Sequence, residues 1–184
     1  PGAGQVYAAI HEVLGAVSAS PRDLDFIAFG CGPGSFTGVR IASAVTQGLA
    51  FGLQIPVFRY SSLGLLAAGS ALHMKADLAD KVFAAAFDAR QNEAYIGFYR
   101  MRAGELESIV PDALVKPKEF KLGDIASALN IRDLILTGPG WELYPSLQLG
   151  AEPIITAYDF DRLPHSFDLF FLAVQAQREG ELTD

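Results

Sequence analysis

Residues 30–40 read GCGPGSFTGVR, and four of the nine residues from Gly30 to Gly38 are glycines. The apolar residues 26–30 predict a buried strand that ends here, and residues 38–52 predict a helix with Thr37 as its N-cap. The first turn of a helix leaves backbone N–H groups unpaired, which suits an anion or a close contact with another chain. The candidate contact residues of this loop are Gly32, Pro33, Gly34, Ser35, Phe36, Thr37, Gly38 and Arg40.

The spacing of the loop matches none of the standard phosphate or nucleophile motifs. The pattern G-x-G-x-x-G fails because Ser35 and Thr37 stand where glycine is required, and the Walker A pattern fails because the loop has no lysine. A nucleophile elbow around Ser35 fails because Pro33 and Thr37 occupy its glycine positions. From its spacing alone, the loop predicts a tight turn and no catalytic residue.

The flanking sequence predicts an α/β chain in two lobes. A strand at 55–60 and a helix from Ser61 or Ser62 to about Met74 follow the loop, which is the order of a parallel crossover. The other expected elements are a helix at 5–17, a turn at 20–23, hairpin strands at 82–87 and 94–99, a strand at 106–110, a helix at 117–129, a strand at 134–136 and a helix at 166–178 ended by Gly180. A charged break at 75–80 predicts lobes over 1–78 and 79–184.

Composition narrows the classes of function. Apolar residues make up 51% of the 184 residues, which excludes intrinsic disorder, and the net charge of −7 disfavours stand-alone binding to a nucleic acid backbone. The single cysteine, Cys31, excludes an internal disulfide framework, and we expect a cytoplasmic protein. The uncharged run 41–58 contains two glycines and Pro56, so we interpret it as a buried helix and a strand rather than a membrane span.

Several motifs in chain order resemble the bacterial TsaB (YeaZ) family. They are GPGSFTGVRI in the loop, the following A-x-x-x-G-L-A and I-P-V, a D-A-R…E-x-Y hairpin at 88–95, and a G-P-G-W turn at 138–141. Cys31 stands where the family usually has arginine, and Ala42 where it usually has glycine. The three opening strands of the family and its terminal P-x-Y-L-R segment do not occur within residues 1–184, so we expect an incomplete N-terminal lobe.

The resemblance implies an actin/Hsp70-like (ASKHA, ribonuclease H-like) two-lobed fold and a role in making threonylcarbamoyladenosine on tRNA. It implies a non-catalytic subunit that activates a TsaD-like enzyme alongside a TsaE-like ATPase and forms a homodimer in isolation. We expect tRNA contact only through the complex, no tightly bound cofactor, and any ATP or ADP at a complex interface. TsaD-type proteins carry a metal-binding H-x-x-x-H pair, but Ser62 and Leu66 stand at those positions, so we expect no metal site and no catalytic residue.

The helix at 38–52 carries no charge between Ile41 and Gly52, and the sheet can cover only one side of it. In the resemblance, this helix and the helix at 5–17 form the surface shared with TsaD or with a second copy. We expect a charge at Ala50 to abolish this association while the monomer stays folded. The predicted interface residues are Tyr7, His11, Ser43, Thr46, Gln47 and Ala50.

Three further interpretations stay open at this point. The charged cluster Asp88, Arg90 and Glu93 is either a ligand contact or an ordinary hairpin turn with a weak surface ion pair. An independent ATP-dependent enzyme of the actin/Hsp70/sugar-kinase superfamily would need an adenosine-binding turn, for which only residues 138–140 are a candidate. A hydrolase that uses Ser35 or His165 is disfavoured by the failed spacings, and His11, His73 and His165 lie far apart.

Overall fold

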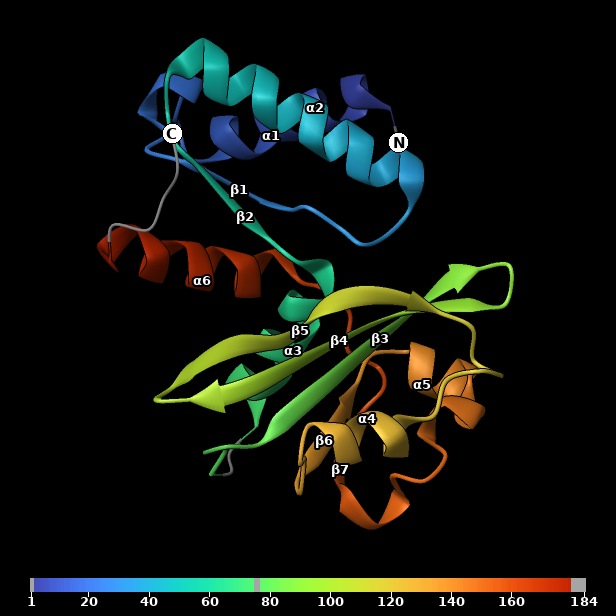
Figure 1. The fold of residues 1–184 in the computed structure, drawn as a ribbon. Helices are drawn as coiled ribbons and strands as arrows, with labels where there is room; N and C mark the ends of the chain where they lie inside the picture. The colour runs from blue at the N-terminus through green and yellow to red at the C-terminus, as the bar shows by residue number, and fades with distance from the viewer. Residues whose placement is uncertain (1, 75–76, 180–184) are drawn as a thin grey trace. The chain divides into compact units, whose positions relative to one another are not determined.

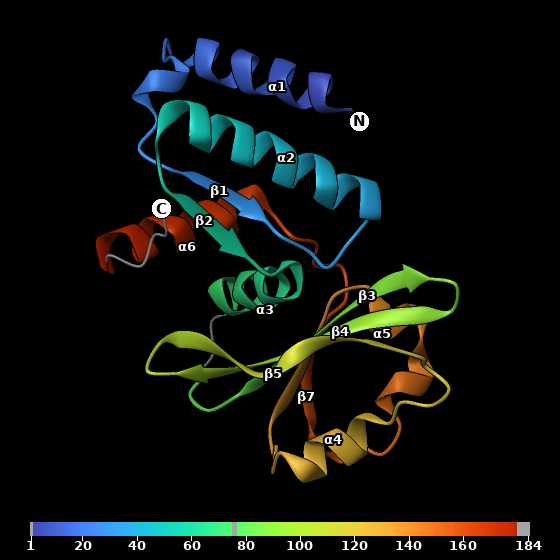
Figure 2. The same cartoon turned by 45° about the horizontal axis from the view of Figure 1, so that its top comes forward.

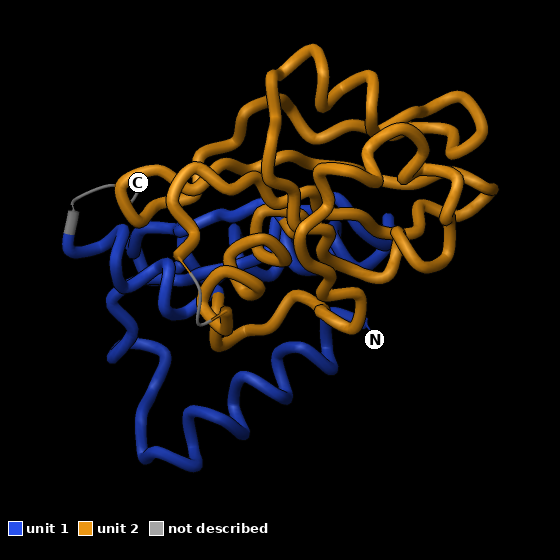
Figure 3. The backbone as a smooth tube through the Cα atoms, turned by 90° about the horizontal axis from the view of Figure 1, so that it is seen from below, with its two compact units in different colours: residues 1–61, 169–184 blue, residues 62–168 orange. Residues whose placement is uncertain are grey.

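The computed structural model describes residues 2–74 and 77–179. The chain divides into two compact units, residues 1–61 with 169–184 and residues 62–168, which Figure 3 shows in different colours. These bounds differ from the predicted lobes, 1–78 and 79–184. Helix α3 (Ser62–His73) packs on the sheet of the second unit, and the chain returns to the first unit within helix α6 (Ser166–Glu179).

The first unit is built around a parallel pair of strands. Strand β1 (Ile27–Gly30) pairs with β2 (Val57–Tyr60), from Ile27 opposite Val57 to Gly30 opposite Tyr60. The connection between them is helix α2 (Phe36–Leu53), and helix α1 (Ala3–Ala16) packs against α2 (Figure 2). The predicted strand–helix–strand order is confirmed, because two parallel strands need a crossover of this length.

Hydrogen bonds between residues close in sequence set the start of α2 and the short helix before β1. Helix α2 begins at Phe36, two residues before the predicted start, with Ser35 at the N-cap position. The Val39 N–H donates to the Ser35 carbonyl at 2.9 Å, so Thr37 lies inside the first turn and the prediction of Thr37 as N-cap is wrong. The predicted turn is confirmed as a 3₁₀ helix at Pro21–Asp23, where the Asp23 carboxylate accepts hydrogen bonds from the Ser20 N–H and hydroxyl.

The uncharged run at 41–58 is divided between α2 and β2. Across residues 2–74 and 77–179, no helix combines the length and the apolar character that a membrane span requires. The interpretation of this run as a helix followed by a strand is confirmed.

The second unit contains a five-stranded sheet in the order β5-β4-β3-β6-β7. Its strands are β3 (Val82–Arg90), β4 (Glu93–Arg102), β5 (Glu105–Val115), β6 (Leu134–Thr137) and β7 (Ile155–Asp159). The pairs β3–β4 and β4–β5 are antiparallel, whereas β6 and β7 run parallel to β3. The hairpin strands and β5 are longer than predicted, and β7 was missed by the sequence prediction.

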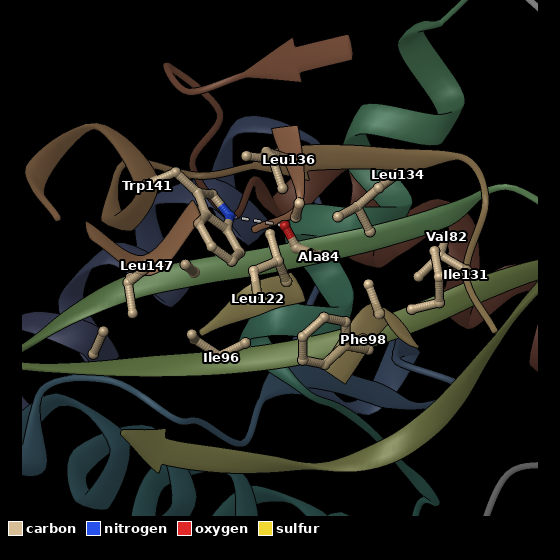
Figure 4. Packing of buried hydrophobic residues seen from close by; sticks show 14 residues of the cluster. Val82, Ala84, Ile96, Phe98, Leu122, Ile131, Leu134, Leu136, Trp141 and Leu147 are labelled. Atoms are coloured by element: carbon tan, nitrogen blue, oxygen red, sulfur yellow. Dashed lines mark hydrogen bonds between the residues drawn. The ribbon is translucent and has the colours of Figure 1, made fainter. Parts of the chain in front are cut away.

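Helices cover both faces of this sheet. Successive residues of β3 point to opposite sides, so each face has its own set of contacts. Val82, Ala84 and Ala86 pack with α4 (Leu122–Ala128) and α5 (Gly140–Leu143) on one face, which Figure 4 shows from close by. Phe83 and Ala85 pack against α3 on the other face. Figure 1 shows this layering, with the strands between α3 and α4. The second unit therefore has a core on each side of its sheet.

Two helix predictions in the second unit change at their ends. The helix expected at 117–129 begins only at Leu122, because Lys121 is extended and the preceding residues form a turn in which the Lys116 carbonyl accepts from Glu119 and Phe120. The last helix, α6, agrees with the prediction of 166–178. Its predicted end at Gly180 lies outside the described residues.

Candidate functional site

The glycine-rich loop continues the pairing of the strands and then folds back onto the first turns of α2. The Cys31 N–H donates to the Tyr60 carbonyl at 2.9 Å, and the Cys31 thiol lies 3.3 Å from the same oxygen. Gly32 has a φ of +97°, and a Cβ at this position would lie 3.4 Å from the Val39 side chain. Glycine therefore lets the loop turn tightly against α2.

The loop exposes an aromatic and a cationic side chain at the start of α2. The Phe36 ring is 70% exposed, and the Arg40 guanidinium lies over it, 3.9 Å from the ring centroid. Ser35 and Thr37 are also exposed, and the Ser35 hydroxyl does not cap the helix. This end of α2 offers an aromatic ring and a cation to a neighbour, so the exposed loop residues stay candidate contacts. Gly32 is buried and is therefore not an accessible contact.

An exposed stripe continues along α2 beyond the loop. Its members recur at helical spacing, and they are Arg40, Ala44, Gln47, Gly48 and Phe51. Phe51 is 88% exposed, the largest exposed fraction among the large hydrophobic side chains of the described residues. The sequence prediction did not include Phe51, although its position four residues after Gln47 places both on one face.

The predicted interface residues on α2 fall on two different sides of the helix. Gln47 is exposed and donates to the Ser43 hydroxyl at 3.1 Å. Thr46 and Ala50 are only 5% and 8% exposed. Assigning these two residues to an accessible surface is therefore wrong, because the chain already covers them. A charge at Ala50 would also have to be buried, so the expectation that such a monomer stays folded is withdrawn.

Helix α1 contributes the remaining predicted interface residues. Tyr7 is 37% exposed and His11 is exposed, and none of the residues of α1 is buried. The Tyr7 hydroxyl lies 3.4 Å from the point where a Cβ of Gly48 would be, so glycine at 48 lets α1 approach α2 closely. The two helices thus form one continuous exposed surface.

A hollow of about 860 Å³ lies at the C-terminal end of α2. Its lining is mostly apolar, and it consists of Gln47, Ala50, Phe51, Gly52, Gln54, Ile55 and Val57. The exposed ring of Phe51 and the amide of Gln47 therefore belong both to the stripe and to this hollow. An apolar hollow beside a stripe whose one charged member, Arg40, lies at its far end is the kind of surface that a partner protein covers.

The charged cluster at the β3–β4 hairpin is tied to a tyrosine that the sequence did not indicate. The Asp88 carboxylate accepts from the Arg90 N–H at 2.9 Å and from the Tyr144 hydroxyl at 2.8 Å, and the Arg90 guanidinium lies 3.6 Å away. These contacts hold the pKa of Asp88 below its ordinary value, the Arg90 N–H contributing most. Donating to this carboxylate raises the pKa of Tyr144.

The third member of the cluster, Glu93, pairs with Arg90 in the strand register but faces a separate hollow of about 350 Å³. The hollow also contains Lys116 and Glu119, which form a surface ion pair at 3.5 Å. Arg90 itself is 89% exposed. The hydrogen bonds of Asp88 hold the hairpin turn in place. The alternative that the charged cluster contacts a ligand stays a prediction.

The G-P-G-W turn packs closely against strand β3. A Cβ on Gly138 would lie 2.6 Å from the Ala86 carbonyl oxygen, and one on Gly140 would lie 2.7 Å from the Ala86 carbonyl carbon. The Trp141 indole N–H donates to the Ala84 carbonyl at 2.8 Å, as Figure 4 shows. The glycines therefore serve close packing on β3, and the alternative of an adenosine-binding turn at 138–140 stays a prediction.

Two of the histidines, His73 and His165, contact residues at the start of α6. His73 lies 3.5 Å from Asp168, and His165 accepts from the Phe167 N–H. No group of three or more His, Cys, Asp or Glu residues in ranges 2–74 and 77–179 has the geometry to hold a metal ion. The structure also leaves the loop and the hairpin in separate compact units.

Comparison with known proteins gives consistent matches. The family model described as TsaD, tRNA N6-adenosine threonylcarbamoyltransferase, matches residues 4–164. The tRNA threonylcarbamoyladenosine biosynthesis protein TsaB of Escherichia coli is 30% identical over 94% of this chain and 71% of its own length. The proteins of the same name from Haemophilus influenzae and Bacillus subtilis are 32% and 40% identical, over 89% and 56% of this chain. The match spans 67% of the Haemophilus protein but only 43% of the Bacillus protein.

Solved structures agree with the sequence relatives. The structure of YeaZ from Pseudomonas aeruginosa has a TM-score of 0.76 and 35% identity, and the match covers 99% of this chain and 79% of that one. A second structure, described as an uncharacterized protein with similarity to peptidase YEAZ from Pseudomonas aeruginosa, has a TM-score of 0.77 and 35% identity, covering 98% and 78%.

Proposed function

The chain belongs to the TsaB (YeaZ) family, and from this membership we propose that it is a non-catalytic subunit that binds and activates a TsaD-like enzyme in the threonylcarbamoyladenosine modification of tRNA. The relatives are named for the biosynthesis of this modified nucleoside. The fold implied by the sequence motifs, the α/β fold of the actin/Hsp70-like class, is confirmed by the matching structures.

The observation that carries the proposal is the exposed surface of α1 and α2. It joins the stripe with Phe51 to an apolar hollow, and α1 has no buried residue of its own. When a partner covers apolar side chains that are this exposed, the removal of their surface from water makes the free energy of binding more favourable. We take the partner to be the TsaD-like enzyme, with a second copy of this chain as its substitute when the enzyme is absent.

Activation then follows from selective binding. A subunit that binds one conformation of the enzyme more tightly raises the population of that conformation, and it needs no reacting group of its own. A TsaE-like ATPase and the tRNA are proposed to meet this chain only within the assembly, because its net charge of −7 repels a phosphate backbone. Any ATP or ADP is proposed to bind at an interface of the complex, and a cytoplasmic location stays a prediction.

The test is co-purification of the full-length protein with the TsaD-like enzyme, comparing wild type with Phe51→Glu. We expect the variant to bind roughly 100-fold more weakly, because a charge in the centre of an apolar interface must be desolvated. Leu143→Glu is the matched control, since Leu143 is a 56% exposed apolar residue of the second unit. Equal binding by Phe51→Glu and wild type would contradict the proposed surface.

The same preparations test the role of the subunit. Modification of tRNA by the enzyme should require this protein and should fall in parallel with binding in Phe51→Glu. Modification at full rate without the protein would rule out the activating role. Tight Mg-dependent ATP binding by the isolated protein would instead favour the alternative of an independent ATP-dependent enzyme.

A further inference from the structure

Helix α2 carries one charged side chain, Arg40, and it lies on the exposed stripe. Within residues 23–58 it is the only lysine or arginine, and residues 26–76 contain no aspartate or glutamate. The ion pairs among the described residues involve five other cationic side chains, those of His73, Lys81, Arg90, Lys116 and Arg162. Arg40 is therefore an exposed charge on an otherwise uncharged helix.

An aromatic ring holds this charge in place. The Arg40 guanidinium lies 3.9 Å from the centroid of the Phe36 ring, which is one helical turn earlier. Arginine can rest against a ring and still donate two parallel hydrogen bonds to a carboxylate. Because the ring already restricts the side chain, less conformational entropy is lost when the guanidinium binds a partner. Arg40 is thus arranged to receive an anionic group.

A single arginine suits a carboxylate better than a phosphate backbone. Proteins that bind nucleic acid neutralise several phosphates with clustered cations, and the net charge of this chain is −7. The loop before α2 contains no lysine and matches neither phosphate motif. An aspartate or glutamate of another protein needs only one guanidinium, because the two groups match in charge and in geometry. The observations therefore favour a protein carboxylate as the group that Arg40 receives.

The two ends of the stripe differ in character. Phe51 and the apolar hollow lie at one end, and Arg40 lies eleven residues earlier, about 16 Å away at the rise of an α-helix. A partner that covers the whole stripe must present an apolar side chain and a carboxylate at that separation. Apolar contacts supply most of the affinity of such an interface, whereas a charge pair at its margin determines which partner and which orientation are accepted.

We propose that Arg40 pairs with a carboxylate of the TsaD-like enzyme and so fixes the direction in which the enzyme lies along α2. The inference rests on the proposed function, because it adds a specificity-determining contact to the same surface. From its own α1 and α2, a second copy of the chain offers only one carboxylate, that of Glu12. Variants of Arg40 and Glu12 therefore distinguish the enzyme from a second copy as the partner of Arg40.

The experiment measures the dissociation constant of the full-length protein for the enzyme at low and high salt, without tRNA or nucleotide. The variants are Arg40→Gln, Arg40→Glu and Arg40→Lys, the last of which keeps the charge but not the planar guanidinium. Arg102→Glu is the matched control, because Arg102 is an exposed arginine of the second unit and its replacement changes the net charge as Arg40→Glu does. Arg40 is exposed, so all three variants should fold, which circular dichroism verifies.

We expect binding to weaken by roughly tenfold in Arg40→Gln and roughly 100-fold in Arg40→Glu at low salt, with Arg40→Lys between wild type and Arg40→Gln. High salt should reduce these differences, because it screens a charge pair at the margin of an interface. Replacing one exposed acidic residue of the enzyme by lysine should restore the binding of Arg40→Glu and thereby identify the carboxylate. Failure of every such enzyme variant to restore binding would overturn the proposal.

Phe51→Glu separates the failure of this inference from the failure of the proposed function. Arg40 variants that bind like wild type, alongside a weakened Phe51→Glu, would overturn the role of Arg40 and leave the proposed function standing. Equal binding by Phe51→Glu and wild type would contradict the proposed surface itself.

Two further outcomes identify a different partner of Arg40. A loss of binding that appears only when tRNA or ATP is added would mean that Arg40 receives a phosphate, and this would overturn the proposal. Weakened self-association in both Arg40→Gln and Glu12→Gln, with binding to the enzyme unchanged, would overturn it as well, because the carboxylate would then belong to a second copy.

Discussion

Helices α1 and α3 show how differently the two units use a helix. Every residue of α3 from Leu63 to Ala71 is buried, whereas α1 has no buried residue along its 14 positions. α3 is therefore held by the core of its own sheet, at roughly 25 cal/mol per Å² of apolar surface removed from water. α1 packs against α2, and Val13 of α1 and its C-cap residue Val17 are 66% and 70% exposed. Of these two helices, α3 is therefore part of a core, and α1 presents an exposed surface.

The two units should differ most in how much the loss of an aromatic side chain lowers the free energy of unfolding. Trp141→Ala should lower the free energy of unfolding by about 3–5 kcal/mol, because the ring is fully buried and its N–H is bonded to Ala84. Phe51→Ala in the first unit should change it by less than about 0.5 kcal/mol, because the ring is 88% exposed. Urea unfolding followed by far-ultraviolet circular dichroism measures both. Similar losses for the two variants would mean that the units are equally closed.

Glycine substitutions should change sign between the units. Gly140→Ala places a methyl group within 2.8 Å of the β3 backbone and should cost about 1–3 kcal/mol. Gly52→Ala places one in open space near the end of α2 and should stabilise the protein by up to about 1 kcal/mol through helix propensity. Thermal unfolding of the two variants against wild type checks the signs. A destabilising Gly52→Ala would show that the first unit packs there more tightly than the structure indicates.

Local sequence signals were enough for most of the fold. The capping pattern at Ser20–Asp23 and the apolar period of α1 and α2 act over a few residues, so they could be recognised directly. β7 was missed because it follows a short 3₁₀ helix containing Pro153 and lies at the sheet edge. Its half-buried alternation, with Ile155 and Ala157 less exposed than Thr156 and Tyr158, was the signal available.

The candidate site was less predictable, because its contacts join distant residues. The period of α2 identified an uncharged helix but could not tell which side the chain itself covers, so Thr46 and Ala50 were placed on the wrong side. Asp168 looks like an ordinary acidic residue in the first turn of a helix. Only the approach of α3 shows that its carboxylate is buried. Tyr144 and Asp88 are 56 positions apart, and no local pattern links them.

The smallest expected effect compares two carboxylates, one from each unit. The pKa of Asp23 is lowered mainly by the N–H of Ser20, three residues away, whereas the pKa of Asp88 is lowered by the Arg90 N–H and also by the distant Tyr144 hydroxyl. Tyr144→Phe should therefore raise the pKa of Asp88 toward its ordinary value while Asp23 titrates as before. Carboxyl-carbon NMR titration measures both groups, and Tyr158→Phe is the control, because Tyr158 is an exposed tyrosine of the same unit.

The sign of the stability change follows from the lowered pKa. A carboxyl group whose pKa is lower in the folded state stabilises the protein above its unfolded pKa, roughly 3.9, and loses that contribution as the pH falls through the folded value. Tyr144→Phe should thus be less stable than wild type at pH 7, and the difference should shrink in acid, where Asp88 is protonated in both proteins. Urea unfolding at pH 7 and in acid tests this convergence. A pH-independent difference would mean that Tyr144 acts on the second unit through packing and not through the Asp88 carboxylate.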